Sequence, residues 1–456
     1  MNNITAVILA AGEGKRMKSN YSKVIHKVAG KPIIKRVCEA VKNAGIEKCV
    51  LVVGHKQEQV RETMGDSVLY AVQSEQLGTG HAVMQAIPEL ENAEKVVVLC
   101  GDAPLLSSDT LKEALKTNVE RKEYATIFTA EFDDPTGYGR IVRDDAGAVV
   151  GIVEHKDATE EQRKIKEVNS SMYCFDKKAL VEALGKLDNN NAQNEYYLTD
   201  VIKIMISEGK KVGTYIVPDK DEIMGINDRE QLSVANEIAR RKINKEYMKN
   251  GVTIIDTNTT YIDGDAKIGK DTIIYPGTIL EGAVEIGENC TIGPNSKITN
   301  AIIGNDTQVI NSVLIDCKVG NSTTVGPFAY LRPNSNIGDH ARIGDFVEIK
   351  NSNIGNGTKV SHLTYVGDSD VGENVNFGCG TVTVNYDGIN KHRTKIGNNS
   401  FIGCNTNLVA PVEVGDRVYT AAGTTVTKDV PDDALVIGRV RQEIKPQWTA
   451  GKIKGC

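Results

Sequence analysis

A six-residue period between Ile262 and Val426 constrains the fold of this chain more than any other feature. Aliphatic residues recur at every sixth position, each followed by small or turn-forming residues, as in IGENCT, IGPNSK and IGDHAR. A period of six cannot keep one face of a helix with 3.6 residues per turn, but it suits short strands joined at corners that take glycine, asparagine or aspartate. We therefore predict a coil of stacked strands with an aliphatic core. A single hexad buries little, so its stability must come from stacking.

The repeat resembles the left-handed parallel β-helix of hexapeptide-repeat acyltransferases. In that family three hexads make one triangular turn, and the handedness is implied by the resemblance and not by the spacing. Such coils also serve as trimerisation stalks without activity. The irregular positions in the repeat must therefore decide between an enzyme and a stalk.

Composition sets limits on the remaining organisation and on the classes of function. With 456 residues, 40% hydrophobic and 25% charged, the chain is long enough for two domains. A formal net charge of −6 argues against a nucleic-acid-binding surface. The nine cysteines form no CxxC pair, which indicates reduced thiols in a cytoplasmic protein and neither disulfides nor a zinc site. The apolar run Ile4 to Ala11 is too short to span a membrane, so we expect neither a signal peptide nor membrane insertion.

The first half of the chain alternates between strand and helix patterns. Strands are predicted at Ala6 to Ala11, Lys48 to Gly54 and Val96 to Asp102, and helices at Pro32 to Gly45 and Glu58 to Met64. This alternation predicts an α/β Rossmann-like domain with a parallel sheet, crossover helices and ligands at the carboxyl ends of the strands.

A helical pattern from Arg229 to about Asn250 follows, with apolar residues at helical spacing among charged ones. We interpret it as a helix that joins the sheet domain to the coil. The predicted domains are a nucleotidyltransferase domain at 1–229, a linker helix at 230–250 and a β-helix domain at 251–456.

The first chemical motif is LAAGEGKRMKSNYSK, from Leu9 to Lys23. A glycine-rich turn directly after a strand lets backbone N–H groups approach phosphate, and Arg16 and Lys23 add positive charge, so both are candidate catalytic residues. The turn is neither a G-x-G-x-x-G fingerprint nor a P-loop. It resembles the nucleotidyltransferase motif of sugar-1-phosphate pyrophosphorylases.

Further motifs extend the resemblance over essentially the whole chain. They are QSEQLGTGHA, GDAPLL, GYGRIVR, IVEHKDA, EVNSSMY and GIND, and together they resemble the bacterial family of bifunctional N-acetylglucosamine-1-phosphate uridylyltransferases and glucosamine-1-phosphate acetyltransferases. The resemblance implies synthesis of UDP-N-acetylglucosamine, a cell-wall precursor, from UTP and acetyl-CoA. It implies that Mg²⁺ is held by Asp102 and Asn227. It also implies a set of residues that bind the nucleotide and its sugar: Leu9, Ala10, Ala11, Gly12, Lys23, Gln73, Gly78, Thr79, Gly139, Glu154, Asn169 and Asn227.

The irregular positions of the repeat cluster in one region, as functional breaks should. LRPNSN and IKNSN place Arg332 and Lys350 at corners, VSHLTY places His362 and Tyr365 on one rung, and the period breaks between Thr383 and Lys395. Acetyl transfer to an amine needs a base of near-neutral pKa, which a histidine supplies, so we predict that His362 is that base. The predicted sugar-phosphate ligands are Arg332, Lys350, Tyr365, Asn376 and Lys391. By resemblance, acetyl-CoA lies along Cys379, Asn385, Tyr386, Cys404, Ala422 and Arg439.

Three cysteines depart from the family pattern. Cys100 stands where tyrosine is common, Cys379 where alanine is common and Cys404 where serine is usual. The last two place thiols beside the predicted thioester. A covalent acetyl-cysteine route is conceivable, but direct transfer is favoured because the family works without these thiols.

Two other functions remain open at this point. The chain could be a uridylyltransferase whose β-helix is only a trimerisation stalk, or a non-catalytic scaffold; a scaffold would be expected to have lost Lys23 or Asp102, and both are present. The family also implies a homotrimer. Phe328, Phe346 and Phe377 are large for the interior of a tight coil, so we expect some of them to point outward and to be covered by neighbouring subunits.

Overall fold

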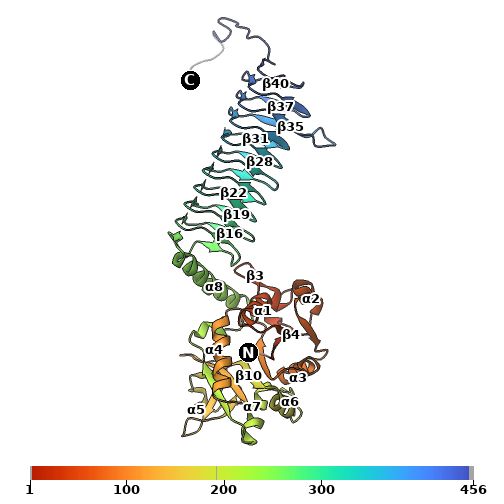
Figure 1. Cartoon of the computed structure of the whole chain (residues 1–456), viewed down its shortest axis with the longest axis vertical. Helices are drawn as coiled ribbons and strands as arrows, with labels where there is room; N and C mark the ends of the chain where they lie inside the picture. Colours follow the sequence, from red (N-terminus) through yellow and green to blue (C-terminus); the bar gives the residue numbers. More distant parts are fainter. Residues whose placement is uncertain (1–2, 192, 451–456) are drawn as a thin grey trace. The chain divides into compact units, whose positions relative to one another are not determined.

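The structure, a computed structural model, describes residues 3–191 and 193–450. The chain divides into two compact units, Met1–Ala239 and Arg240–Cys456. Figure 1 labels some of the elements of both units, and each unit is described here by itself.

The first unit is built on a nine-stranded sheet. Its main path runs β11-β7-β10-β6-β1-β4-β5, and β8 and β9 lie off this path, with β8 paired to β10. The strands β1 (Ile4–Ala10), β4 (Lys48–Val53) and β6 (Lys95–Cys100) and the helices α1 (Ile33–Asn43) and α2 (Gln57–Met64) confirm the predicted alternation. The remaining elements of the sheet and its helices are β5 (Leu69–Val72), α3 (Thr79–Gln85), α4 (Ser108–Glu120), β7 (Ala125–Glu131), β8 (Gly139–Arg143), β9 (Val149–Val153), α5 (Glu160–Arg163), β10 (Glu167–Asp176), α6 (Lys177–Leu184), α7 (Leu198–Ser207) and β11 (Val212–Ile216).

The prediction of a parallel sheet is wrong for part of this unit. β1, β4, β5 and β6 pair in parallel, but β10 runs antiparallel to β6, β7 and β8. Helical crossovers preserve strand direction, whereas the β8–β9 hairpin reverses it before the chain enters β10. The sheet is therefore mixed.

The two faces of the sheet bury separate apolar clusters. Along β1, Val7 points into one cluster and Ala6 and Ile8 into the other, as the two-residue period of a strand requires. One cluster contains side chains of α3, α6 and α7, and the other contains side chains of α1 and α4. Helices thus cover both faces, which leaves the strand ends free for ligands.

Helix α8 (Arg229–Lys249) matches the predicted joining helix. In its first half Ala235 and Ala239 pack into a cluster of the first unit. In its second half Ile243 and Tyr247 pack against the core of the second unit, where the Tyr247 hydroxyl donates to the Ala266 carbonyl at 2.5 Å. One helix therefore contributes apolar residues to both cores.

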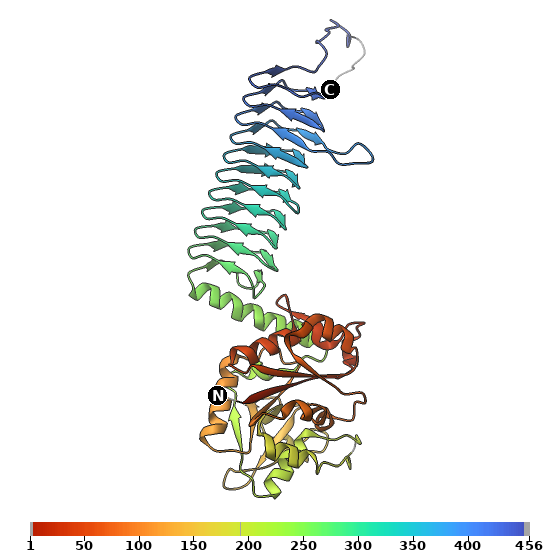
Figure 2. The ribbon, with the colours of Figure 1, turned by 45° about the vertical axis from the view of Figure 1, so that its right-hand side comes forward.

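The second unit is a parallel β-helix of three sheets (Figure 2). The first sheet runs from β12 (Thr253–Ile254) to β41 (Leu435–Val436), the second from β13 (Tyr261–Ile262) to β40 (Thr425–Val426), and the third from β14 (Lys267–Ile268) to β38 (Val412–Val414). Ile274 pairs with Ile292, a separation of 292 − 274 = 18 residues. One turn therefore takes three hexads, as the resemblance to the hexapeptide-repeat family implies.

The aromatic residues of the β-helix divide between its interior and its surface. Phe328 and Phe346 point outward, with 56% and 59% of their surface exposed. The expectation that phenylalanine is too large for the interior is wrong for Phe377, which is 3% exposed and belongs to the apolar core. Its partner on the preceding rung is Val360, a smaller side chain that leaves room for the ring.

The break in the repeat is a loop between β34 (Val382–Val384) and β35 (Thr394–Ile396). It projects from the stack of rungs in Figure 2 and is closed by an antiparallel bridge between Tyr386 and Lys391. This confirms the predicted polar excursion. Within residues 3–191 and 193–450, none of the helices combines the length and the apolar character needed to cross a membrane.

Candidate active sites

A cavity of about 290 Å³ lies in the first unit beside the carboxyl ends of β1 and β6. It is the place where a doubly covered sheet leaves room for ligands. Most of the predicted nucleotide residues line it: Leu9, Ala10, Ala11, Gly12, Lys23, Gln73, Gly78 and Thr79. The predicted magnesium ligand Asp102 lines it as well. The sequence interpretation assigned no role to Gln76 or Glu195, which also line it; Gln76 lies within the motif QSEQLGTGHA, and Glu195 lies in none of the motifs.

The glycine-rich turn fits closely around Lys23. Gly14 has a positive φ of 62°, and a Cβ atom there would lie 2.8 Å from the Cβ atom of Lys23. The turn therefore needs glycine at this position both for its backbone and for the approach of the lysine. Arg16 follows in the 3₁₀ turn Lys15–Met17, where its own side chain is exposed, and it does not line the cavity.

Lys23, Asp102 and Asn227 meet at one point. The Lys23 ammonium lies 2.5 Å from Asp102 Oδ2 and 3.2 Å from Asn227 Oδ1. Asp102 is held there because its carbonyl accepts from the Ile226 N–H at 2.9 Å, directly before Asn227. Two oxygen ligands from distant parts of the sequence thus converge on one cation.

Gln73 and Gly78 form the far wall of the cavity. Gln73 is buried, and its side-chain amide donates to the Gly78 carbonyl at 3.0 Å and lies 3.1 Å from His81 Nδ1. Gly78 has a φ of 107°, and a Cβ atom there would lie 2.6 Å from the Tyr196 carbonyl oxygen. A side chain at position 78 would therefore disrupt the wall that presents Gln73.

The predicted sugar residues Gly139, Glu154 and Asn169 lie together. Gly139 pairs with Asn169 across β8 and β10, and a Cβ atom on Gly139 would lie 3.6 Å from Glu154 Oε1. Burial, followed by the charges of Asp157 and Asp200, raises the pKa of Glu154 above its ordinary value. These three residues therefore form one polar wall.

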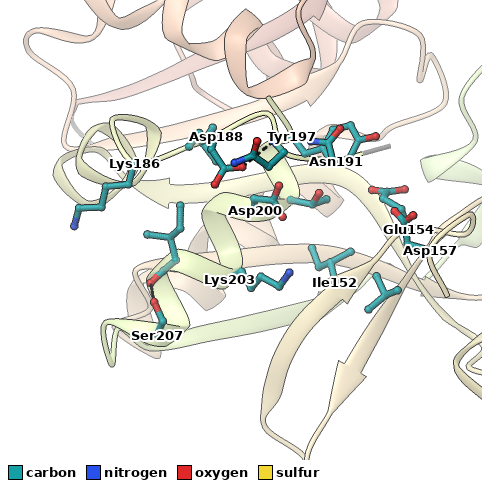
Figure 3. A pocket seen from close by; sticks show the side chains of 15 residues that line it. Ile152, Glu154, Asp157, Lys186, Asp188, Asn191, Tyr197, Asp200, Lys203 and Ser207 are labelled. Atoms are coloured by element: carbon teal, nitrogen blue, oxygen red, sulfur yellow. Dashed lines mark hydrogen bonds between the residues drawn. The ribbon is translucent and has the colours of Figure 1, made fainter. Parts of the chain in front are cut away.

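Glu154 also lines a pocket of about 680 Å³ (Figure 3). Figure 3 shows Glu154 and Asp157 at one end and Lys186 and Ser207 at the other. Asp157 belongs to the motif IVEHKDA but was assigned no role there, and no motif includes Lys186 or Ser207. Most of the residues that line the pocket are polar or charged.

Cys100 lies on the wall of the nucleotide cavity. Its thiol is 3.4 Å from the Ser171 carbonyl oxygen, and burial raises its pKa, so the thiol stays neutral. The departure from tyrosine therefore adds no charge beside Asp102.

In the β-helix, His362 pairs with Asp345 of the preceding rung, and this partner was missed by the sequence analysis. The two residues end β30 (Lys359–His362) and β27 (Arg342–Asp345) and are register partners. His362 Nδ1 lies 2.6 Å from Asp345 Oδ1. This hydrogen bond lowers the pKa of Asp345 below its ordinary value. No sequence motif joins residues that are one rung apart.

The corner that carries His362 continues toward the C-terminus as a column. Val360, Phe377, Ile402 and Thr420 are successive register partners. The residues two positions after each of them are His362, Cys379, Cys404 and Ala422. Arg439 closes the column, because its guanidinium donates to the Ala422 carbonyl at 2.5 Å. Four residues that were predicted to bind acetyl-CoA thus lie in line with the predicted base.

The predicted anion ligands Arg332, Lys350 and Lys391 line a cavity of about 350 Å³. Arg332 and Lys350 hold the same position on successive rungs, after the register partners Leu331 and Ile349. The neighbouring ammonium of Lys350 lowers the pKa of Lys391. Three cationic side chains at one place are suited to a doubly charged phosphate group.

Asp368 is a buried carboxylate within this cationic cavity, and the sequence analysis missed it. Its side chain accepts from Asn351 at 2.5 Å and from Asn385, and it lies 3.6 Å from Lys350 Nζ. Burial opposes its ionisation, but these partners together hold its pKa below the ordinary value. Asp368 therefore fixes Lys350 and the base of the projecting loop.

Tyr365 lies on the outer surface of the β-helix, near the base of the projecting loop. Its ring lies against Gly367, and its hydroxyl is 3.4 Å from the Asn385 side-chain amide. Two predicted residues lie elsewhere. Asn376 is on another sheet, in β33 (Asn376–Phe377), and Tyr386 is exposed in the loop with its hydroxyl bonded to the Gly388 carbonyl.

Comparisons with known proteins match a different family to each of the two units. Residues 5–223 match the family described as Nucleotidyl transferase, and residues 265–300, 316–351 and 393–428 match the family described as Bacterial transferase hexapeptide (six repeats). A relative from Acetivibrio thermocellus, called Bifunctional protein GlmU, is 57% identical over 453 residues, which are 99% of this chain and 98% of the relative.

Relatives of the same name from two other bacteria are similar over the same extent. The one from Clostridioides difficile is 53% identical and covers 99% of this chain and 98% of its own length. The one from Caldanaerobacter subterraneus is 54% identical and covers 100% of this chain and 99% of its own length. With more than half of its residues identical to these relatives over almost their full length, and with both transferase families matched along its sequence, this chain belongs to the GlmU family of bifunctional proteins.

Proposed function

We propose that the two units catalyse consecutive reactions through the residues gathered in their cavities. The GlmU family pairs an acetyltransferase with a uridylyltransferase for the synthesis of UDP-N-acetylglucosamine, a cell-wall precursor. The observation that carries the assignment is that each unit assembles its own set of predicted residues, around Lys23 and Asp102 in one and around His362 and Lys350 in the other. Because UTP and acetyl-CoA are cytoplasmic metabolites, the proposal also supports the cytoplasmic location expected from the sequence.

The first reaction is acetylation of glucosamine-1-phosphate. Arg332, Lys350 and Lys391 bind its phosphate, which places the sugar on the outer face next to His362. The sugar amine attacks the thioester carbonyl of acetyl-CoA, the imidazole accepts the amine proton, and coenzyme A leaves as a thiolate that is then protonated. The column from Cys379 to Arg439 holds the coenzyme.

The second reaction joins N-acetylglucosamine-1-phosphate to UMP. Its phosphate oxygen attacks the α-phosphorus of UTP in line and pyrophosphate leaves, so the protein must chiefly position the reactants and neutralise charge. The attacking phosphate is already an anion and needs no base. Lys23 supplies positive charge, the wall with Gln73 holds the nucleotide, and Glu154 and Asn169 hold the sugar.

A magnesium ion fits beside Asp102 and Asn227. A carboxylate and an amide oxygen already converge on a single cation there, the Lys23 ammonium. Magnesium takes few ligands from a protein and the rest from water and substrate phosphates, so these two oxygens are a suitable set. When bound, the ion would neutralise charge on the phosphates of UTP.

An exposed apolar strip supports the proposal of a homotrimer. Phe328, Phe346 and Leu363 follow one another at one corner of successive rungs, 56%, 59% and 59% exposed, with positive φ values of 60°, 55° and 44°. A left-handed backbone costs about 1–2 kcal/mol for such residues, and Asn311 and Gly380 take the same corner on the flanking rungs. A strained, exposed strip beside His362 is favourable when other copies of the chain cover it.

The two-site proposal is tested with one variant in each unit. Asp102→Ala should abolish formation of UDP-N-acetylglucosamine and leave acetyl transfer intact. His362→Ala should slow acetyl transfer by about 10²–10⁴-fold and leave uridylyl transfer intact. Equal loss of both activities in either folded variant would refute separate sites. Acetyl transfer by His362→Ala within about tenfold of wild type would refute the base assignment, whereas no acetyl-CoA turnover by the wild type would favour a β-helix that serves only as a stalk.

A further inference from the structure

The contact between Asp345 and His362 is one feature of the acetyl-transfer face that the catalytic roles above do not use. β27 and β30 extend over four residues, whereas β24 (Thr324–Val325) and β33 of the same sheet extend over two. The pairing continues through the corner as far as Asp345 and His362, where the Leu363 N–H also donates to the Asp345 carbonyl at 3.0 Å. The fold thus aligns these two side chains on adjacent rungs.

Gly344 makes this alignment possible. A Cβ atom at position 344 would lie 2.0 Å from the Ser361 carbonyl oxygen, so a side chain would push the two rungs apart. Such a clash with backbone cannot be relieved by rotating a side chain. The close approach of the rungs therefore depends on glycine directly before Asp345.

The contact fixes the protonation pattern of the imidazole. An ionised carboxylate can only accept a hydrogen bond, so Nδ1 of His362 must carry the proton that is donated to Asp345 Oδ1 at 2.6 Å. In neutral imidazole the lone pair is then on Nε2. Within the described ranges, 3–191 and 193–450, no hydrogen bond from a protein group to Nε2 is present, and this nitrogen is free to accept a proton.

The same contact contributes little to stability. The side chains of His362 and Asp345 are 54% and 37% exposed, and exposed ion pairs typically contribute about 0–1 kcal/mol. Arg342 is the other charged group whose field acts on the carboxylate, and it also favours the ionised form. An exposed pair with a 2.6 Å hydrogen bond is better explained by orientation than by stabilisation.

We propose that Asp345 is the positioning residue of the acetyl-transfer base: its carboxylate fixes the tautomer and the orientation of His362 so that Nε2 accepts the proton of the attacking amine. This inference rests on the proposed role of His362. It assigns Asp345 no contact with the substrates. During the reaction the carboxylate also stabilises the imidazolium that forms when the proton is accepted.

The test compares Asp345→Asn and Asp345→Ala with a matched control, Glu285→Gln. Glu285 forms an exposed ion pair with Lys267 at 2.5 Å in the same unit, far along the repeat from His362, so its variant should match wild type. Both Asp345 variants should lower kcat of acetyl transfer by about 10- to 100-fold, part of the 10²–10⁴-fold that a general base contributes, with KM for glucosamine-1-phosphate little changed.

Two readouts separate positioning from a structural role. The ¹⁵N NMR shifts of the His362 ring should show protonation at Nδ1 in the wild type and a mixture of tautomers in Asp345→Ala. The loss in the Asp345 variants should appear in kcat and not in KM for glucosamine-1-phosphate. A merely structural residue would change the melting temperature and KM and leave the tautomer as it was; that result overturns the proposal.

The design also separates this inference from the proposal on which it rests. If His362→Ala loses acetyl transfer while Asp345→Ala keeps kcat within about threefold of wild type, only the positioning role is wrong. If His362→Ala itself keeps its activity, the base assignment fails first. The double variant Asp345→Ala/His362→Ala should be no slower than His362→Ala alone, because both changes remove one function. Additive losses would overturn the inference.

Discussion

Gly367→Ala should weaken sugar-phosphate binding by displacing Tyr365 and not by disturbing the fold. A Cβ atom at position 367 would lie 2.3 Å from the Tyr365 hydroxyl oxygen and 2.5 Å from its Cζ atom. The nearest atoms all belong to one side chain, and Gly367 has no positive φ, so the backbone accepts alanine while the ring must move. The tyrosine hydroxyl then leaves its place beside the Asn385 amide, 3.4 Å away.

The size of the effect follows from the contact that is lost. That contact is the proposed hydrogen bond between the Tyr365 hydroxyl and the charged phosphate of glucosamine-1-phosphate. A hydrogen bond to a charged group contributes about 1.5–3 kcal/mol, which corresponds to about 10- to 150-fold in affinity. Because this contact is made before and during the reaction, the change should appear mainly as a higher KM for glucosamine-1-phosphate, with kcat little affected. The melting temperature and uridylyl transfer by the same variant should be unchanged.

The assay is release of the coenzyme A thiol at varied glucosamine-1-phosphate. Tyr365→Ala should produce the same increase in KM, and the double variant Gly367→Ala/Tyr365→Ala should be no worse than Tyr365→Ala alone. A KM within about twofold of wild type in the folded single variant, or losses that add in the double variant, would show that Gly367 does not act through the tyrosine.

Two further predictions concern the thiols and the apolar strip. Alkylation should modify the exposed Cys404 first and should slow acetyl transfer more than uridylyl transfer, and acetyl-CoA should protect against it. Cys174 should stay unmodified because burial raises its pKa to about 12. Labelling confined to Cys38 or Cys49 would contradict the placement of the coenzyme. The double variant Phe328→Asn/Phe346→Asn should relieve the strain of the left-handed backbone but should dissociate the proposed trimer, as measured by sedimentation velocity. An unchanged trimer would exclude the strip from the interface.

The sequence by itself determined the architecture of the second unit. The six-residue period and its corner residues are local properties that repeat on every rung, so a coil of stacked short strands and the loop after Val384 followed from them, whereas three hexads per turn was implied by the resemblance to the hexapeptide-repeat family. Strand β1, helix α1 and helix α8 could also be predicted from the sequence, because each is encoded by local periodicity and end signals. The side chains or backbone of Leu9, Ala10, Ala11, Gly12, Lys23, Gln73, Gly78, Thr79 and Asp102 line one cavity, although the motifs that contain them are far apart in the sequence.

Only the tertiary structure decided which side chains stand next to one another. Asp345 reaches His362, and Asp368 reaches Lys350, because the rung length brings residues 17 or 18 positions apart into register, and nothing in a six-residue pattern marks an outward carboxylate as a partner. The column from Cys379 to Cys404 spans a longer loop, so its register depends on how the excursion closes.

The remaining differences have the same origin. Strand β10 runs antiparallel because its direction is set by the preceding hairpin, which a strand pattern does not reveal. Phe377 enters the core because its neighbours on adjacent rungs leave room for a ring, and Arg16 lies outside the cavity because the 3₁₀ turn directs it to solvent. Periodicity is a property of neighbours along the chain, whereas packing, register and strand direction are properties of neighbours in space, and these complete the two sites.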